Sequence, residues 1–454
     1  MRHDTMTGTR SGIRGRAWLS AGCLLVMVCS VAVAGGRGKP SRSTVSREFY
    51  EGRELFVKIW EPGKPSPTGG DGLGPLYNEA SCVACHHLGG VGGAGGNDRN
   101  VLMLTAVASP TDAEKAGKLF VGDIKDLHAG FRAGASVVIH RHATDEALEV
   151  QLGKIQSYAV ADSRGAMVGL RKSTRNTPSI FGAGVIDAIS DRVLLAAEKR
   201  EFPRFPEIKG RVSRLPDGRL GRFGWKGQTS ALRDFVLAAC SNELGLEVPG
   251  RHQASLAPIE ETGISGPKLD LDADQCNLLI QYVRELPTPV IRPAIEVKTY
   301  WGYAVFESIG CAACHAPSLG GVDGLFSDML LHDMGQSLAD AATYYGSSTP
   351  ARRDDLAAGK DGARPTGGAS STEWRTPPLW GIADSAPYLH DGRASSLDQA
   401  IRLHGGEAAA TATRYARLTP LGRDELSVFL RSLTAAPKPR KSSALAARRA
   451  SGRP

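Results

Sequence analysis

CVACH (residues 82–86) and CAACH (residues 311–315) are the two stretches that decide what kind of chain this is. In each, two cysteines three positions apart are followed directly by a histidine, which is the attachment motif of c-type haem. The thiols add to the two vinyl groups of one porphyrin, and the histidine then lies beneath the iron. The sequence therefore predicts two covalently attached haems c, with their iron. The predicted attachment and proximal residues are Cys82, Cys85 and His86 in the first motif and Cys311, Cys314 and His315 in the second.

Other uses of these cysteines explain the pattern less well. A zinc site built from both CxxC pairs is disfavoured because the pairs lie far apart in sequence and an oxidising compartment disfavours free thiolates. A thiol redox site accounts for one pair but not for a histidine after both. Of the four other cysteines, Cys23 and Cys29 fall in the N-terminal apolar stretch, and Cys240 and Cys276 remain. We expect a disulfide between them in an oxidising compartment, with two buried thiols as the alternative.

The N-terminus has the three parts of a secretory signal. Arginines up to Arg16 precede an uncharged apolar run over residues 17–34, which ends in the small residues Ala32-Val33-Ala34. The run is also just long enough for a thin membrane anchor, since a span takes about 17–25 residues. We predict a cleaved signal peptide over 1–34 and a periplasmic or otherwise exported chain. The alternative is membrane association through an uncleaved signal anchor.

The formal net charge of +8 is concentrated at the two ends of the chain. The basic residues of the C-terminal end are Lys438, Arg440, Lys441, Arg448, Arg449 and Arg453. The body between the ends is close to neutral, so a basic groove for nucleic acid is not expected. The stretch 437–454 is rich in Ser, Ala and basic residues and is predicted to be a disordered tail.

Each haem motif follows a predicted helix, over residues 47–58 before the first and 300–308 before the second. The 54 glycines predict long irregular loops, and the apolar run 136–140 predicts a little β-structure. The expected fold is mainly α, with two cytochrome c-like haem domains. A last helix is predicted from Thr419, with Pro420 at its first position.

The domain boundary is predicted in LPTPVIRP (residues 286–293), because its prolines cannot continue the helix that precedes it over 274–286. This divides the exported chain into an N-terminal haem c domain over 35–290 and a C-terminal haem c domain over 291–436.

Several longer stretches are similar to a known family. They are GLGPLYNEASCVACH (72–86), RNTPSIFGAGVIDAI (175–189), GRFGWKG (221–227), LLHDMG (330–335), EWRTPPLWGIA (373–383), YLHDGRASSLDQAI (388–401) and HGGEA (404–408). Together they resemble the di-haem oxidoreductases of the thiol-oxidoreductase-like type, which are related to the bacterial di-haem cytochrome c peroxidases and to the tryptophan-oxidising enzyme that matures quinone cofactors. The resemblance implies an N-terminal haem that meets peroxide and a C-terminal haem that relays electrons.

The resemblance also implies a sixth ligand for the iron of the C-terminal haem. That position falls on His404, where the peroxidases have methionine and the quinone-maturing enzyme has tyrosine. Histidine is a stronger donor to ferric iron, so His404 implies a lower potential than methionine would give. Met334 in LLHDMG is the rival ligand.

Further site residues follow from the same resemblance. Trp225 matches the tryptophan between the two haems, and Glu243 falls near the acid that helps to split peroxide. His390 matches a histidine close to the haem but not on the iron, while Arg375 and Arg393 are candidates to pair with haem propionates. The alternatives are core packing for Trp225, a solvent-facing carboxylate for Glu243 and ordinary surface or capping arginines.

A sixth ligand for the N-terminal iron is predicted from the residues alone. His140 ends the apolar run 136–140 and is therefore expected to face inward. His142 and His128 are the alternatives.

Two functions remain open at this point. The first is an oxidoreductase that reduces peroxide, or uses peroxide to oxidise another molecule, with electrons from a small donor protein or a quinone-linked donor. The second is an electron-transfer cytochrome in which both irons are six-coordinate, which the extra histidines favour. Thiol or sulfur oxidation is suggested only by the name of the family that the chain resembles.

Overall fold

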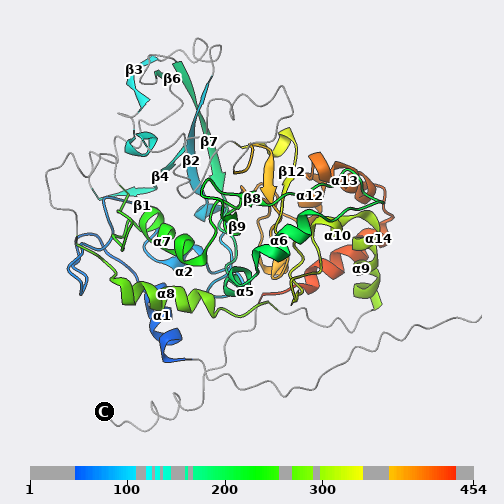
Figure 1. Cartoon of the computed structure of the whole chain (residues 1–454), viewed down its shortest axis with the longest axis horizontal. Coiled ribbons are helices and arrows are strands. Elements are labelled where there is room, and N and C mark those ends of the chain that lie inside the picture. The colour runs from blue at the N-terminus through cyan, green and yellow to red at the C-terminus, as the bar shows by residue number, and fades with distance from the viewer. Residues whose placement is uncertain are drawn as a thin grey trace, which may run out of the picture. The chain divides into compact units, whose positions relative to one another are not determined.

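The computed structural model describes residues 46–108, 119–124, 128–132, 136–144, 159–161, 167–254, 268–289, 297–340 and 368–435. They belong to one compact unit, Val45–Pro454. The fold is mainly α, which confirms the predicted class (Figure 1). None of the helices in these ranges combines the length and the apolar character that a transmembrane span requires. The predicted signal peptide, the tail and residues 290–293 of the predicted domain boundary lie outside them.

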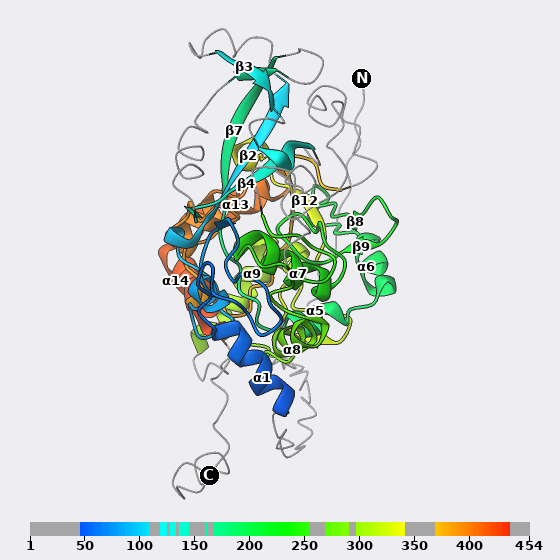
Figure 2. The ribbon, with the colours of Figure 1, turned by 90° about the vertical axis from the view of Figure 1, so that its left-hand side faces the viewer.

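The cysteines of the first motif form the short helix α2 (Cys82–Cys85). The neighbouring helices are α1 (Arg47–Val57), α5 (Ala183–Asp187), α7 (Leu232–Glu243) and α8 (Ala273–Arg284). Helices α1 and α8 pack side by side (Figure 2). The Phe56 and Tyr282 rings pack between them, tilted by 53° and with centroids 5.1 Å apart. The close approach requires Gly52, because a Cβ there would lie 2.1 Å from the backbone oxygen of Leu278. The predicted helix before the first motif is confirmed.

The cysteines of the second motif form the short helix α10 (Cys311–Cys314). The neighbouring helices are α9 (Val297–Ile309), α12 (Leu397–Arg402), α13 (Ala409–Ala416) and α14 (Pro420–Ser432). Helices α9 and α14 pack around Phe306 and Phe429, whose ring centroids are 5.3 Å apart. Thr419 caps α14 by accepting a hydrogen bond from the Gly422 amide. The predicted helix before the second motif and the predicted last helix are therefore confirmed.

Two glycines in these helices give a matched pair of predictions. A Cβ at Gly302 of α9 would lie 2.0 Å from the Glu425 backbone oxygen, whereas one at Gly422 of α14 would meet nothing closer than 3.5 Å. Gly302→Ala is therefore expected to lower the free energy of unfolding by about 1–3 kcal/mol. Gly422→Ala should raise it by about 0.5–1 kcal/mol, because alanine favours the helix. Urea denaturation of both variants checks this, and equal effects at the two sites would contradict it.

The fold also contains a five-stranded sheet, whose strand order is β3-β6-β7-β2-β4. Its strands are β2 (Val101–Ala108), β3 (Leu119–Asp123), β4 (Ser136–Ile139), β6 (Ala159–Ala161) and β7 (Met167–Arg175). Strands β2 and β7 pair antiparallel along their whole length and lead away from the helices (Figure 2). Only β4 was predicted. The sheet is larger than the sequence indicated, because its long strands pair residues that are distant along the chain.

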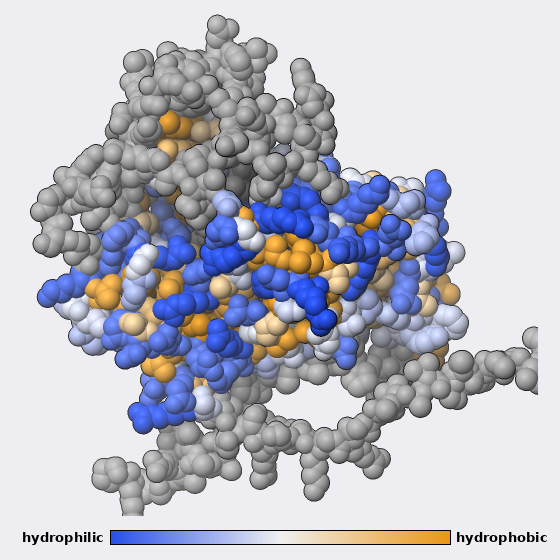
Figure 3. All heavy atoms as spheres, viewed as in Figure 1, coloured by the Kyte–Doolittle hydropathy of each residue, from blue (hydrophilic) through white to orange (hydrophobic). Residues whose placement is uncertain are grey.

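Short elements complete the fold. The two-residue and three-residue strands are β1 (Leu76–Tyr77), β5 (His142–Ala143), β8 (Ser213–Arg214), β9 (Leu220–Gly221), β10 (Ser318–Leu319), β11 (Val322–Asp323), β12 (Leu331–Asp333) and β13 (Glu373–Arg375). The remaining helix α6 spans Asp191–Glu198. Single 3₁₀ turns span Asn97–Arg99, Ala129–Arg132, Gln336–Leu338, Ile382–Asp384 and Gly406–Ala408. Hydrophobic side chains reach the surface in small groups between hydrophilic ones (Figure 3).

The two described cysteines outside the motifs, Cys240 and Cys276, are buried in the core as free thiols. Cys240 lies on α7 and Cys276 on α8. Burial raises the pKa of the Cys276 thiol to about 11, so it stays protonated at neutral pH. The predicted disulfide is therefore wrong, and the alternative of two buried thiols is the one observed.

Candidate functional site

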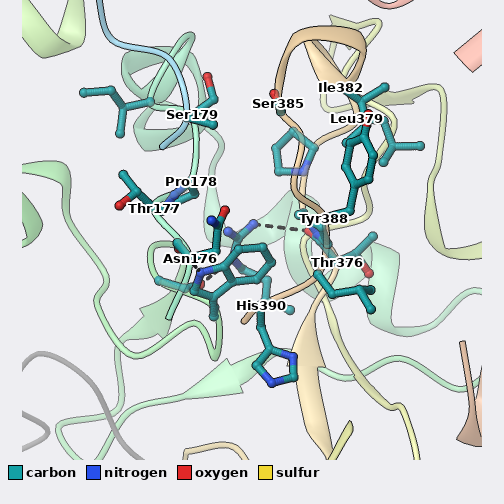
Figure 4. A pocket seen from close by; sticks show the side chains of 18 of the residues that line it. Asn176, Thr177, Pro178, Ser179, Thr376, Leu379, Ile382, Ser385, Tyr388 and His390 are labelled. Carbon is teal, nitrogen blue, oxygen red and sulfur yellow. Dashed lines mark hydrogen bonds between the residues drawn. The ribbon is translucent and has the colours of Figure 1, made fainter. Parts of the chain in front are cut away.

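One cavity of about 380 Å³ reaches both CxxCH motifs. Its lining includes the cysteines and histidine of each motif and is otherwise largely apolar, with several aromatic side chains. Figure 4 shows Thr177, Pro178 and Ser179 on one wall and Leu379 and Ile382 on the opposite wall. A largely apolar cavity with a few convergent polar groups is what a cofactor requires. The fold thus brings together two motifs that are far apart in sequence.

The histidines of the two motifs are oriented in the same way. His86 Nδ1 lies 3.1 Å from the Gly93 carbonyl oxygen, and His315 Nδ1 lies 3.0 Å from that of Phe326. A carbonyl oxygen only accepts, so Nδ1 carries the hydrogen and Nε2 keeps its lone pair. Burial lowers the pKa of both histidines to about 4, which keeps them neutral. A neutral imidazole oriented by a backbone carbonyl is the form that binds iron, so these residues fit a haem at each motif.

Both candidates for the sixth ligand of the second haem line the same cavity. His404 follows α12 and donates its Nδ1 hydrogen to the Ala400 carbonyl oxygen at 2.7 Å, again leaving Nε2 with a lone pair. It lies near enough to His315 for their charges to interact, and burial lowers the pKa of His404. Met334 follows β12. The choice between the two remains a prediction, although the orientation of His404 is the one that a ligand needs.

Trp225 and Glu243 also line the cavity. Trp225 Nε1 donates to the backbone oxygen of Asn176 at 2.9 Å, which fixes the plane of the indole. Glu243 lies at the end of α7, and its Oε2 accepts from Asn78 Nδ2 at 2.7 Å. The structure therefore brings both predicted residues to the motifs. Their roles remain predictions.

Of the predicted cofactor contacts, Arg375 and His390 line the cavity. Arg375 is buried and donates to the Gly224 and Thr376 carbonyl oxygens at 2.9 and 3.2 Å. Burial lowers its pKa to about 10, and the charge of the Asp328 carboxylate opposes that shift. A buried cation whose hydrogen bonds go to backbone carbonyls and not to a carboxylate suits a haem propionate.

His390 and Arg393 differ in their surroundings. The His390 ring stacks on Trp374 with centroids 3.7 Å apart, and burial lowers the pKa of His390 to about 3. Arg393 lies outside the lining, half exposed, and is paired with Asp391 at 2.5 Å. Only His390 of these two is therefore placed to contact a group in the cavity.

None of the three histidines predicted for the iron of the first haem lines the cavity. His140 is buried, and its Nε2 lies 2.8 Å from the Asn242 backbone oxygen. His128 is buried nearby, and His142 is exposed and stacks on Tyr77 with centroids 5.2 Å apart. Facing inward, as predicted for His140, does not bring a side chain to the motif.

Burial of His140 predicts sensitivity to acid. Burial lowers its pKa to about 4, whereas an unfolded chain has a histidine pKa near 6.5. Below pH 6.5 the unfolded chain therefore binds a proton that the folded chain does not, so stability falls as the pH falls. We expect His140 alone to lower the free energy of unfolding by about 2 kcal/mol when the pH falls from 7 to 5. Urea denaturation should show that His140→Gln reduces the loss and that the exposed neighbour, His142→Gln, does not.

The sequence analysis missed a buried carboxylate–histidine–carboxylate cluster beside the second motif. His332 Nε2 lies 2.9 Å from Asp328 Oδ2, and His332 Nδ1 lies 2.7 Å from Glu407 Oε2. His332 and Asp328 are almost fully buried. Both LLHDMG and HGGEA had been noted, but only for Met334 and His404. His332, two residues before Met334, and Glu407, three residues after His404, were the signal that could have revealed the cluster.

Lys226 was also missed, although it follows Trp225 directly. It is buried, and its Nζ donates to the Ser370 and Glu373 carbonyl oxygens at 2.7 and 3.0 Å. The same nitrogen lies 4.0 Å from the centre of the Trp374 ring. Burial lowers the pKa of Lys226 to about 7. A lysine within a glycine-rich stretch gives no sign of such burial.

Residues 143–433 match the family model described as "Di-haem oxidoreductase, putative peroxidase". No curated protein matches the chain. The solved structures that are similar to it include hydrazine synthase of Kuenenia stuttgartiensis, the diheme peroxidase BthA of Burkholderia thailandensis, and a MauG-like protein associated with microbial copper homeostasis.

The three similarities are remote. The synthase is 22% identical and has a TM-score of 0.32, covering 57% of this chain and 73% of its own. BthA is 14% identical over 86% of each chain, with a TM-score of 0.35. The MauG-like protein is 16% identical over 55% of this chain and 90% of its own, with a TM-score of 0.30. Such low scores add nothing to the family match. That match spans more than half of the sequence, so the chain belongs to the di-haem oxidoreductase family, which implies two haems and their iron.

Proposed function

We propose that the chain is an exported, peroxidase-like oxidoreductase with two covalently attached haems c. The first, on Cys82 and Cys85, is the reactive centre, and the second, on Cys311 and Cys314, is the electron relay. The observation that carries this proposal is the cavity shared by both motifs, which also holds Trp225 and Glu243. When bound, the haem irons supply the redox chemistry by which peroxide takes up two electrons.

The side chains around the cavity have three tasks in this function. His86 and His315 present a neutral Nε2, because their Nδ1 atoms are engaged by backbone carbonyls. The Glu243 carboxylate can accept a proton and return it, and Asn78 holds it in one orientation. The Trp225 ring offers a flat, polarisable surface on the cavity that both motifs share, and its plane is fixed by the bond to Asn176. Electrons would come from a small donor protein or a quinone-linked donor.

The second candidate is an electron-transfer cytochrome with both irons six-coordinate. One observation favours it: His404 lines the cavity that holds His315 and keeps an Nε2 lone pair, because its Nδ1 hydrogen is donated to Ala400. This would make the iron of the second haem six-coordinate. It does not explain a carboxylate such as Glu243 at the cavity, since a pure relay has no proton to transfer.

The proposal is tested on the haem-loaded protein, reduced by one electron per molecule and mixed with hydrogen peroxide. We expect rapid peroxide consumption and loss of a high-spin EPR signal. Glu243→Gln should lower the rate by a factor of about 10²–10⁴, because a positioned acid–base group contributes that much. Glu247→Gln is the control, since Glu247 is a buried glutamate that does not line the cavity. Two unchanged low-spin signals with peroxide left over would establish the electron carrier instead.

A further inference from the structure

The buried cluster around His332 links three segments near the second motif. Asp328 reaches the motif through its amide, which donates to the Cys314 carbonyl oxygen at 2.9 Å. His332 lies between Asp328 and Glu407, with its Nδ1 3.6 Å from Cys314 Sγ. Glu407 follows His404 by three residues. The cluster thus forms a continuous chain of contacts from the attachment cysteine to the turn that carries His404.

Glu407 makes more contacts than the one with His332. Its Oε2 also accepts from the Lys209 amide at 2.8 Å, and its Oε1 lies 3.4 Å from the Asp333 amide nitrogen. This one carboxylate therefore joins its own turn to two segments that are distant in sequence, one at Lys209 and one at His332 and Asp333. Its removal would leave His332 buried with one carboxylate partner and two amides without their acceptor, and such losses are costly inside a protein.

The turn itself has no space in which to move toward β12. A Cβ on Gly406 would lie 2.2 Å from the Asp333 backbone oxygen, and one on Gly405 would lie 2.8 Å from that of Met334. Gly406 also has φ = +53°, a conformation that glycine adopts without strain. The two glycines allow the turn to lie directly against the segment that carries Met334. The two rival ligands are therefore carried by backbone segments in contact, and Glu407, on the turn that carries His404, bonds to His332 and Asp333 of the other segment.

We propose that Glu407 is a positioning residue that acts through His332. By fixing the turn after α12, it holds His404 at the iron of the second haem and keeps Met334 away from it. The inference rests on the proposed function, in which a haem is attached at Cys311 and Cys314. Two features of the structure support it: His404 lines the cavity and donates its Nδ1 hydrogen to Ala400, which leaves Nε2 with a lone pair, and Glu407 ties the turn to His332 and Asp333.

The test uses the full-length, haem-loaded protein and the Glu407→Ala variant. In the wild type we expect a bis-histidine low-spin EPR signal from the second haem and weak binding of carbon monoxide to its ferrous form. Glu407→Ala should lose that signal and bind carbon monoxide at least about tenfold more tightly, since the gas no longer competes with a positioned ligand. Glu407→Gln should restore most of the signal, because an amide still reaches His332 with an oxygen.

Glu247→Ala is the matched control. Glu247 is buried, lies 2.7 Å from the Nδ1 of a histidine, His252, and accepts from the backbone amide of Gln253 at 2.9 Å. It lies outside the cavity lining, so its loss should leave the haem spectra unchanged. If Glu407→Ala fails to load haem, Glu407→Asp is measured instead. Its carboxylate is one methylene shorter and should weaken the signal in part.

His404→Gly separates failure of the inference from failure of the proposed function. If His404→Gly changes the EPR signal and the carbon monoxide binding of the second haem and the Glu407 variants do not, the positioning role of Glu407 is wrong, while His404 remains the ligand and the proposed function is unaffected. If His404→Gly changes nothing, His404 is not the ligand and the inference falls with it. Peroxide consumption at the first haem is measured on the same samples, and its absence in the wild type would overturn the proposed function alone.

Discussion

A variant in which Cys82 and Cys85 are both serine is expected to carry one covalent haem in place of two. Serine cannot form the thioether bonds that hold the porphyrin, so the haem of the first motif is lost on denaturation. The second motif lies on α10, after a separate helix, and should keep its own haem. The mass of the denatured chain and the haem content per molecule measure this directly. Cys240→Ser with Cys276→Ser is the control, because these thiols belong to neither motif.

The same variant separates the two proposed roles. Without the first haem, peroxide consumption should disappear while the low-spin signal of the second haem remains. The reverse variant, with serine at Cys311 and Cys314, should keep a high-spin centre that no longer receives electrons from the relay. Two covalent haems in either variant would show that the motifs are not the attachment sites.

Sequence predicted the features that depend on residues close together in the chain. The helix over 47–58 was recognisable from its apolar spacing, and the structure has α1 at Arg47–Val57. The start of α14 follows from Thr419 and Pro420 as local end signals. The two CxxCH motifs are likewise complete within five residues each. For such features the physical cause lies within one helical turn, so one sequence is sufficient.

Features that depend on distant contacts could not be predicted in the same way. The pairing of β2 with β7 joins Val101 to Arg175, and no short window of sequence contains both. His140 was correctly expected to be buried, but its direction is decided by Asn242, about a hundred residues away along the chain. The missed cluster has the same cause: His332 is a lone histidine until the fold supplies Glu407.

The error over the cysteines has a different cause. An oxidising compartment makes a disulfide favourable only if two sulfurs can approach in the required geometry. Cys240 and Cys276 lie on neighbouring helices within the apolar core, where they pack as small hydrophobic side chains. Composition and compartment therefore indicated a bond that the helix packing does not make.

His404→Met is expected to raise the reduction potential of the second haem. Histidine donates more strongly to ferric iron than a thioether does, so the native side chain stabilises the oxidised state and the replacement favours the reduced one. Axial ligands move haem potentials over a range of about 0.8 V, and we expect an upward shift of at least about 0.1 V. A redox titration followed at the absorption of the second haem measures it.

Met334→Leu is the comparison that makes this titration decisive. Leucine has a similar volume but no sulfur, so it removes the only donor atom that Met334 could offer. If His404 is the ligand, Met334→Leu should leave the potential close to that of the wild type, while His404→Met shifts it upward. If Met334 were the ligand, the order would reverse, because leucine would empty the position and His404→Met would leave the iron ligands as they were. A native relay with His404 bound would have a low potential, so it would pass electrons to the first haem readily but would require a strongly reducing donor.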